Sequence, residues 1–401
     1  MPKVNPEILR WARDTAGLGL AEAAAKLGIR EARGVAAPDR LLALERGEVS
    51  PTRPTLVKMA KHYRRPLLTF YLSKPPRTGD RGQDFRTLPA DYSRSDEVLL
   101  DALIRSVRAR QSLVRAALED EDEATPLEFV GSVRPEMGVS GVLSSLRQVL
   151  GLSLRDYRTQ GSQDQAFDTL RSSVEELGVF VLLLGNLGSH HTNLGLETFR
   201  GFALADPVAP FVVINDQDSR AAWSFTLLHE LTHILLGQTG VSGGAPPRGI
   251  EKLCNDVAAE FLLPPHELAE LPLADPLDFE RLAAGIGEFA TERKLSRSMV
   301  AYTLHRHQRI SPQIWHLLHE HFRQRWFEEV ERRRIRERDR AGGPDYYVVR
   351  RHRIGSGLIE LTARLLAAGA LTTYKAGQVL GVRPTQVASL IGESPSFRRA
   401  S

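Results

Sequence analysis

Apolar positions gather most densely between residues 210 and 236. The run from Pro210 to Asp216 is rich in β-type residues and predicts a strand. The next segment, from about Ser219 to Leu236, predicts a helix that Gly237 ends. Its apolar residues lie nearly all round the helix, which therefore should be buried. They are Trp223, Phe225, Leu227, Leu228, Leu231, Ile234, Leu235 and Leu236.

This apolar helix contains the sequence His229-Glu230-Leu231-Thr232-His233. Imidazoles four residues apart share one helix face, where they can hold one Zn²⁺ through two nitrogens. Glu230 then reaches a water on the same metal, which is the core chemistry of a metallopeptidase. The alternative is an ordinary core helix whose histidines bond to backbone carbonyls. The metal interpretation is favoured because buried polar groups cost free energy unless something pairs with them.

A second helix is predicted from about Ile250 to Leu263, after a Gly/Pro-rich loop from Gly240 to Gly249. Pro264 and Pro265 would end it. The face that carries Glu251 also carries Cys254, Asn255 and Ala258.

Glu251 is the candidate third ligand, since a catalytic zinc commonly has three protein ligands and one open position. Helix phase alone leaves Asp256 and Glu260 open as rivals. The alanines of this helix would let it approach the zinc helix closely.

Together, the strand, the HELTH helix and the downstream E-x-L-C-N-x-x-A-A-E-F-L-L-P helix resemble the ImmA/IrrE metallopeptidases. The similarity is best from Gln163 to Glu267, and it extends to Asp84-Phe85-Arg86. The resemblance implies that Glu251 ligates zinc. It also implies a protein substrate, a transcriptional repressor cleaved in response to stress or mobile-element signals.

The expected centre holds one Zn²⁺ per chain through His229, His233 and Glu251, with Glu230 as the catalytic base. Mn²⁺ could replace zinc in the cell, because metal availability can overrule affinity. Tyr302, His305 and His307 are candidate oxyanion donors by residue type only. The favoured alternative is that these three pack or face solvent.

A further strand is predicted from Gly201 to Ala205, paired with the strand before the zinc helix across the Asp206-Pro207 turn. In zinc peptidases an edge strand near the site often holds the substrate in extended form, and this strand is a candidate. The alternative is an ordinary strand inside the sheet.

The composition is that of a globular protein, with 401 residues, 42% hydrophobic and 25% charged. No apolar run is long enough to predict a transmembrane helix, and the first residues do not form an apolar signal segment. The single cysteine, Cys254, excludes internal disulfides and favours a reducing cytoplasm. A redox role for Cys254 is conceivable, although a small buried apolar residue is the favoured interpretation.

The charge is segregated along the chain. Residues 1–75 contain 14 Lys and Arg against 7 Asp and Glu, and residues 341–401 contain 8 against 3. Since the net charge is +4, residues 76–340 carry −8. Basic ends around an acidic centre indicate that the ends would meet an anionic partner such as DNA, unless they are simply solvated surface.

The N-terminal segment predicts four helices, Pro6 to Ala16, Leu20 to Leu27, Arg40 to Gly47 and Thr55 to Tyr63. Their order and the L-E-R-G-E-V-S-P-T-R-P-T-L run resemble Xre-type DNA-binding domains. Two departures weaken the comparison. About ten residues, Ile29 to Pro38, replace a short turn, and the third helix lacks the usual base-reading side chains. The segment could therefore bind DNA or serve as a docking or dimerisation surface.

The whole pattern predicts an α+β, mostly helical protein. It would have a zincin-like peptidase core with a small sheet, an N-terminal helix-turn-helix bundle and a small C-terminal helical domain. The proposed division is residues 1–75, 76–160, 161–270, 271–340 and 341–401. The second segment is a helical linker region, and the fourth is a helical extension with an Arg/Glu-rich helix from Gln324 to Arg340. The last contains a helix-turn-helix-like pair, Thr372 to Leu380 and Pro384 to Ile391, which could bind DNA or a partner protein or be generic two-helix packing. The oligomeric state stays open.

Overall fold

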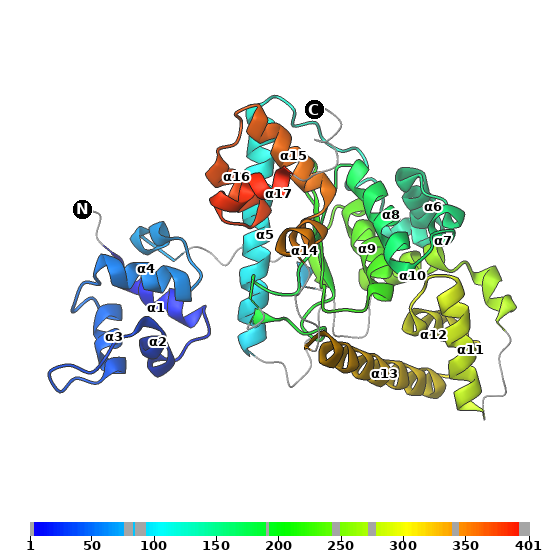
Figure 1. Cartoon of the computed structure of the whole chain (residues 1–401), viewed down its shortest axis with the longest axis horizontal. Helices are drawn as coiled ribbons and strands as arrows, with labels where there is room; N and C mark the ends of the chain where they lie inside the picture. Colours follow the sequence, from blue (N-terminus) through cyan, green and yellow to red (C-terminus); the bar gives the residue numbers. More distant parts are fainter. Residues whose placement is uncertain are drawn as a thin grey trace. The chain divides into compact units, whose positions relative to one another are not determined.

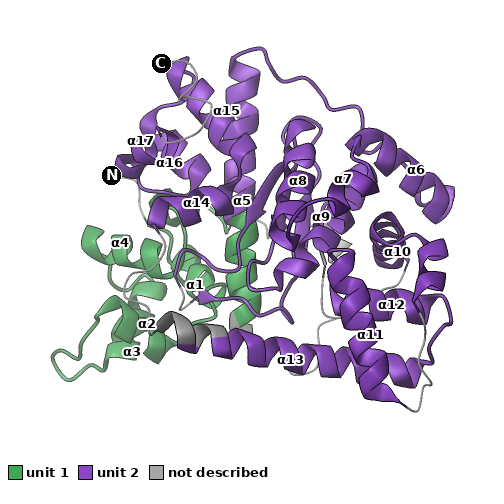
Figure 2. Cartoon of the chain, turned by 45° about the vertical axis from the view of Figure 1, so that its right-hand side comes forward, with its two compact units in different colours: residues 1–81, 90–105 green, residues 82–89, 106–401 purple. Residues whose placement is uncertain are grey.

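The chain divides into two compact units. The computed structural model describes residues 4–75, 83–84, 94–189, 192–242, 249–271, 278–338 and 345–392 (Figure 1). Unit 1 comprises residues 1–81 and 90–105, and unit 2 comprises residues 82–89 and 106–401 (Figure 2). The finer division into five segments stays a prediction.

Unit 1 is a small helical bundle with its own core. Its helices are α1 (Pro6–Asp14), α2 (Leu20–Leu27), α3 (Ala37–Glu45), α4 (Arg53–His62), the 3₁₀ turn η1 (Leu67–Tyr71) and the start of α5 (Arg94–Asp120). Buried apolar residues of α1 to η1 form one cluster, which includes Ile8, Leu41 and Phe70. Arg13 and Glu45 form a buried ion pair between α1 and α3, with 2.7 Å between Arg13 Nε and Glu45 Oε1.

The four predicted N-terminal helices are present, but the third begins earlier than predicted. The prediction placed its start at Arg40, and α3 begins at Ala37. Pro38 lies in the first turn, where a helix tolerates proline because its N–H would be unpaired there in any case. The inserted connection before it is closed by paired backbone bonds between Ala32 and Val35.

Unit 2 contains a mixed sheet in the order β1-β5-β3-β4-β2. The strands are β1 (Gln83–Asp84), β2 (Phe180–Leu183), β3 (Gly201–Leu204), β4 (Phe211–Ile214) and β5 (Gly240–Ser242). β3 runs antiparallel to both β4 and β5, while β2 pairs with β4 and β1 with β5 in parallel. All residues of β2, β3 and β4 are buried, which explains their continuous apolar sequences.

Helices cover this sheet and extend beyond it. They are α6 (Gly138–Leu150), α7 (Leu154–Arg158), α8 (Gln163–Glu176), α9 (Arg220–Leu235), α10 (Ile250–Leu262), α11 (Phe279–Glu292), α12 (Arg297–Arg306), α13 (Pro312–Arg338), α14 (Tyr346–Ile354), α15 (Ser356–Ala367), α16 (Thr373–Leu380) and α17 (Val387–Ile391). Short 3₁₀ turns are η2 (Pro135–Met137), η4 (Pro265–Glu270) and η5 (Pro384–Gln386). α9 packs on β3 and β4 and against α8 and α10, while α14 and α15 contact β2.

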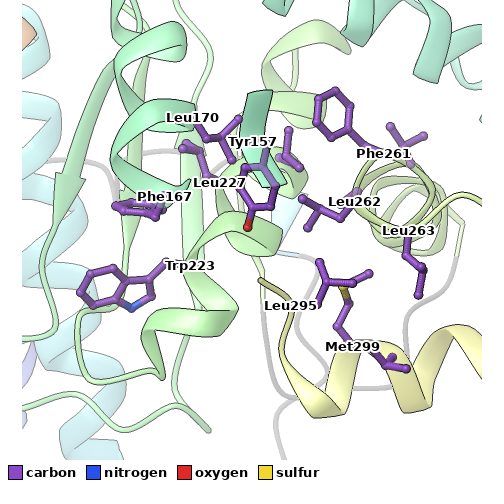
Figure 3. Packing of buried hydrophobic residues seen from close by; sticks show 14 of the residues in the cluster. Tyr157, Phe167, Leu170, Trp223, Leu227, Phe261, Leu262, Leu263, Leu295 and Met299 are labelled. Atoms are coloured by element: carbon purple, nitrogen blue, oxygen red, sulfur yellow. The ribbon is translucent and has the colours of Figure 1, made fainter. Parts of the chain in front are cut away.

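One large apolar cluster joins the sheet to these helices. Figure 3 shows part of it, where Phe167 of α8 and Trp223 of α9 lie close together. Their ring centroids are 5.3 Å apart in an edge-to-face contact. The cluster continues through Phe261 of α10 to Leu295, which precedes α12, and to Met299 of α12, so the apolar helix α9 is fixed on several sides.

Three boundaries differ from the predictions. β5 occupies the first residues of the predicted Gly240 to Gly249 loop, because β3 and β1 offer it partners on both sides. The Arg/Glu-rich helix was predicted from Gln324, and α13 begins twelve residues earlier at Pro312, where Leu318 and Phe322 bury apolar surface. The last predicted helix is split into η5 and α17.

The predicted fold class is confirmed: the chain is α+β and mostly helical, with a small sheet in unit 2. Among the helices that the structure describes, none combines the length and apolar character that crossing a bilayer requires.

Candidate active site

Helix α9 brings His229 and His233 together with Glu251 of α10. His233 Nε2 lies 2.9 Å from Glu251 Oε1, and His229 Nε2 lies 3.4 Å from Glu251 Oε2. The two Nε2 atoms are 3.2 Å apart. All three residues are buried, with at most 7% of any residue exposed. The structure thus places the three predicted ligand residues in one group that could hold a metal ion.

The spacing and chemistry of these atoms fit a tetrahedral metal ion. Ligand atoms at the usual 2.0–2.2 Å from zinc lie roughly 3.3 Å from one another. The observed separations of 2.9 to 3.4 Å bracket that value. Two imidazole nitrogens and one carboxylate form a donor set typical of catalytic zinc.

Burial and mutual attraction together set the pKa values of His229, His233 and Glu251. Burial disfavours a charged His229, but the attraction of Glu251 and Glu230 outweighs burial and raises the pKa of His229. Burial and the neighbouring His229 lower the pKa of His233, even though Glu251 opposes the shift. Burial would raise the pKa of Glu251, yet the bonds from both imidazoles lower it to about 2. Glu251 is therefore ionised and ready to act as a ligand near neutral pH.

Glu230 lies beside the ligand group and is completely buried. Its carboxylate packs against the backbone of β3 at Gly201, where a Cβ would come within 2.7 Å of Glu230 Oε1 and 2.7 Å of Thr226 Cγ2. Gly201 is thus required for the close approach of α9 to β3. The sequence alone does not mark this glycine as important, because its role depends on a contact between residues 29 positions apart.

Helix α10 approaches α9 through small residues. Ala258, Ala259 and Cys254 are completely buried, as the alanines in the sequence suggested. Asn255 lies near His229 and helps to raise the pKa of that imidazole. Burial and the nearby Glu251 raise the pKa of the Cys254 thiol well above its ordinary value, so this cysteine stays protonated.

The two rival carboxylates belong to a different network. Asp256 Oδ1 lies 2.9 Å from Arg306 Nε, and Asp256 Oδ2 accepts a hydrogen bond of 2.7 Å from Lys252. Glu260 Oε1 accepts a bond of 2.6 Å from Arg306 Nη2. Both acids are thus engaged by cations away from the histidines, while Glu251 is the carboxylate of α10 that faces His229 and His233.

The three candidate oxyanion donors have other contacts. Tyr302 donates a hydrogen bond of 3.0 Å to Asp256 Oδ1, on the side of α10 away from Glu251. His305 stacks on Trp315 with ring centroids 4.8 Å apart. His307 follows the end of α12, and burial together with Arg306 lowers its pKa.

The strand that was a candidate for holding substrate is not an edge strand. β3 pairs with β4 on one side and with β5 on the other, so its backbone groups are already used within the sheet. The edge-strand hypothesis for residues 201–205 is therefore wrong. Asp84 lies in β1 beside β5, whereas Phe85 and Arg86 lie outside the described residues.

Comparison with known proteins identifies part of the chain. Residues 177–305 match the family model Peptidase M78, described as the IrrE N-terminal-like domain. The matched segment contains β2 to α12, and so all four residues of the candidate site. No curated protein and no solved structure gives a match.

Proposed function

Because the chain carries a peptidase domain of the ImmA/IrrE family, we propose that it is a zinc-dependent endopeptidase that cleaves one protein substrate at a specific site. The observation that carries the proposal is the position of Glu230, buried directly beside His229, His233 and Glu251. Burying a carboxylate costs free energy, so a carboxylate without a functional role is not expected at this position.

His229, His233 and Glu251 would hold the metal. When bound, a divalent ion lowers the pKa of a water molecule toward neutrality and polarises a carbonyl oxygen. Two imidazoles and one carboxylate favour zinc by affinity, and manganese is the second candidate.

Glu230 would act as the general base and then as the general acid. It accepts a proton as water attacks the substrate carbonyl, and it later gives that proton to the leaving amine. Its packing against Gly201 restrains the carboxylate, which keeps it aligned for both transfers.

The substrate we propose is a transcriptional repressor, cleaved during a stress response or in the control of a mobile element. The family resemblance supports this substrate class, which would be met in the cytoplasm. Unit 1 could bring the peptidase to DNA where the repressor sits. Its exposed Arg30, Arg33 and Arg53 and its net charge of +7 over residues 1–75 support electrostatic contact with phosphates.

A co-incubation experiment tests the peptidase proposal. The full chain is mixed with the repressor encoded nearest to it, with zinc and then with an excess of chelator. We expect cleavage at one bond, loss of cleavage with chelator, and none with Glu230→Gln. Cleavage that survives the chelator, or that Glu230→Gln retains at the parent rate, would contradict the mechanism.

The second candidate function is a DNA-binding regulator whose peptidase-like domain acts as a sensor or scaffold. The separate core and basic charge of unit 1 favour it. Tight metal binding without cleavage of any candidate repressor, together with a gel shift that added salt abolishes, would favour this function over the first.

A further inference from the structure

Two arginines of unit 2 meet where α5, α14 and α16 come together. Arg110 of α5 is buried, with 8% of its surface exposed, and Arg350 of α14 is partly buried. Both guanidinium groups reach Gly381, the residue that ends α16 in the left-handed conformation. Arg350 Nη2 donates to the Gly381 carbonyl, and Arg110 Nη2 occupies the space that a Cβ on Gly381 would need. Figure 2 shows α5 beside this group of C-terminal helices.

The described residues supply no carboxylate for this pair. Arg110 Nε and Nη1 and Arg350 Nε are buried and have no hydrogen-bond partner there. Burial and the like charge of Arg350 lower the pKa of Arg110 to about 10. The charge of the nearby Arg353 is compensated, because its Nη2 lies 2.6 Å from Asp216 Oδ2.

The other two arginines that are buried among the described residues, Arg13 and Arg171, are compensated. Arg171 has its guanidinium 3.0 Å from Glu175 Oε1 and also donates to two backbone carbonyls. Arg13 is paired with Glu45. The carbonyl end of α16 offers Arg110 and Arg350 a partial negative charge of about half a unit, which is too little for two full positive charges. Arginine does not lose its proton near neutral pH, so deprotonation offers no relief.

We propose that Arg110 and Arg350 form a binding site for a phosphate group. Two guanidinium forks match the tetrahedral oxygens of phosphate, and its double negative charge balances both cations. A carboxylate would balance only one of them. The group could belong to free phosphate or to a nucleotide.

Occupancy of this site would strengthen the attachment of α14 to the peptidase. The anion would join α5 to α14 through one ligand. α14 in turn contacts the sheet at β2 and places His352 near Trp223 of α9, with ring centroids 6.0 Å apart. A ligand that binds only the folded state raises the stability of that state in proportion to its saturation.

The experiment uses the full chain at constant ionic strength. Equilibrium dialysis with labelled inorganic phosphate measures stoichiometry, and thermal unfolding is followed in phosphate and in chloride. We expect one phosphate per chain and a saturable rise in Tm that chloride does not produce. Both effects should be lost in Arg110→Met and in Arg350→Met. Lys375→Met removes an exposed cation from α16 and should keep both, which controls for general charge effects.

In chloride, Arg110→Met should be at least as stable as the parent, because it replaces an uncompensated buried charge with an apolar side chain. Competition by AMP would assign the site to a nucleotide phosphate, and phosphate binding without such competition would assign it to the free ion. The proposal is overturned if the parent binds no phosphate, or if either methionine variant keeps the full response. Dialysis of the parent decides the matter even if a variant does not fold.

Discussion

The two faces of α10 carry the same type of residue in opposite roles. On one face, Glu251 meets two imidazoles, with His233 Nε2 at 2.9 Å. On the other, Asp256 and Glu260 meet the guanidinium of Arg306, at 2.9 Å and 2.6 Å. All three acids lie within ten residues on one helix. The side chains opposite them therefore decide which face can hold a metal.

The difference lies in whether the partner can give up its charge. An imidazole can lose its proton and offer a lone pair to a metal ion, whereas a guanidinium has no lone pair to offer and stays protonated. We call the Glu251 face of α10 exchangeable, because its imidazole partners can release a proton and bind a metal ion instead. We call the Asp256 face closed, because Arg306 stays charged and cannot bind a metal ion. The same helix separates the candidate metal-binding group from a cluster of ion pairs.

The largest effect should come from removing the base beside the exchangeable face. Glu230→Gln should lower kcat by about 10²–10⁴-fold, because proton transfer loses its acceptor. The metal content should stay at the parent level, since Glu230 is not among the three grouped ligand residues. Steady-state cleavage rates and metal analysis of the purified protein test both halves. A variant that loses its metal would reassign Glu230 from base to ligand.

A matched pair of substitutions compares the two faces directly. Glu251→Gln should weaken zinc binding by more than about 100-fold, which exceeds the usual effect of altering an outer partner of a metal site. Glu260→Gln, on the opposite face, should leave zinc affinity close to that of the parent. Competition with a chelating dye measures both. Equal losses in the two variants would mean that the ligand assignment on α10 is wrong.

Removing an ion pair from the closed face should lower the free energy of unfolding and leave metal binding unchanged. Asp256→Asn leaves the guanidinium of Arg306 with a weaker partner, and removing one member of a buried ion pair costs about 3 kcal/mol or more. Denaturant unfolding should show this loss, while zinc stoichiometry stays at one per chain. Stability within error of the parent would show that Glu260 alone holds Arg306 in place.

The smallest expected effect is a pH dependence of metal affinity. The pKa of His229 is raised and that of His233 is lowered, so one proton competes with the metal as the pH falls through the pKa of His229. Zinc affinity should be full above that pKa and should fall about tenfold per pH unit below it. Dye competition at a series of pH values gives the slope. A slope near two protons would mean that both histidines are charged in the metal-free protein.

The sequence predicted that His229, His233 and Glu251 would lie together, and it did not predict the closed face. The spacing of His229 and His233 depends only on local helix geometry, which the pattern of apolar residues fixes. The choice between Glu251 and its rivals depended on Arg306, which lies 46 residues beyond Glu260 and contacts α10 from α12 only in the folded chain. Helix phase cannot contain that information.

Strand positions show the same limit. The apolar run at Phe211–Ile214 predicted β4 with nearly correct ends. The place of β3 inside the sheet could not be predicted, because β5 is a short strand within a Gly-rich stretch and only its pairing makes it a strand. Gly201 likewise owes its importance to a contact with Glu230 that appears only when α9 is packed on the sheet.

The labelling rate of Cys254 can measure how often the α9–α10 contact opens. It is the single cysteine of the chain, completely buried, and its thiol stays protonated. A thiol reagent can therefore react only when the two helices separate for a moment, so the labelling rate reports the frequency of that opening. Because a bound metal would tie α9 to α10, the labelling rate of the unmodified chain would report how firmly the candidate metal site is held together.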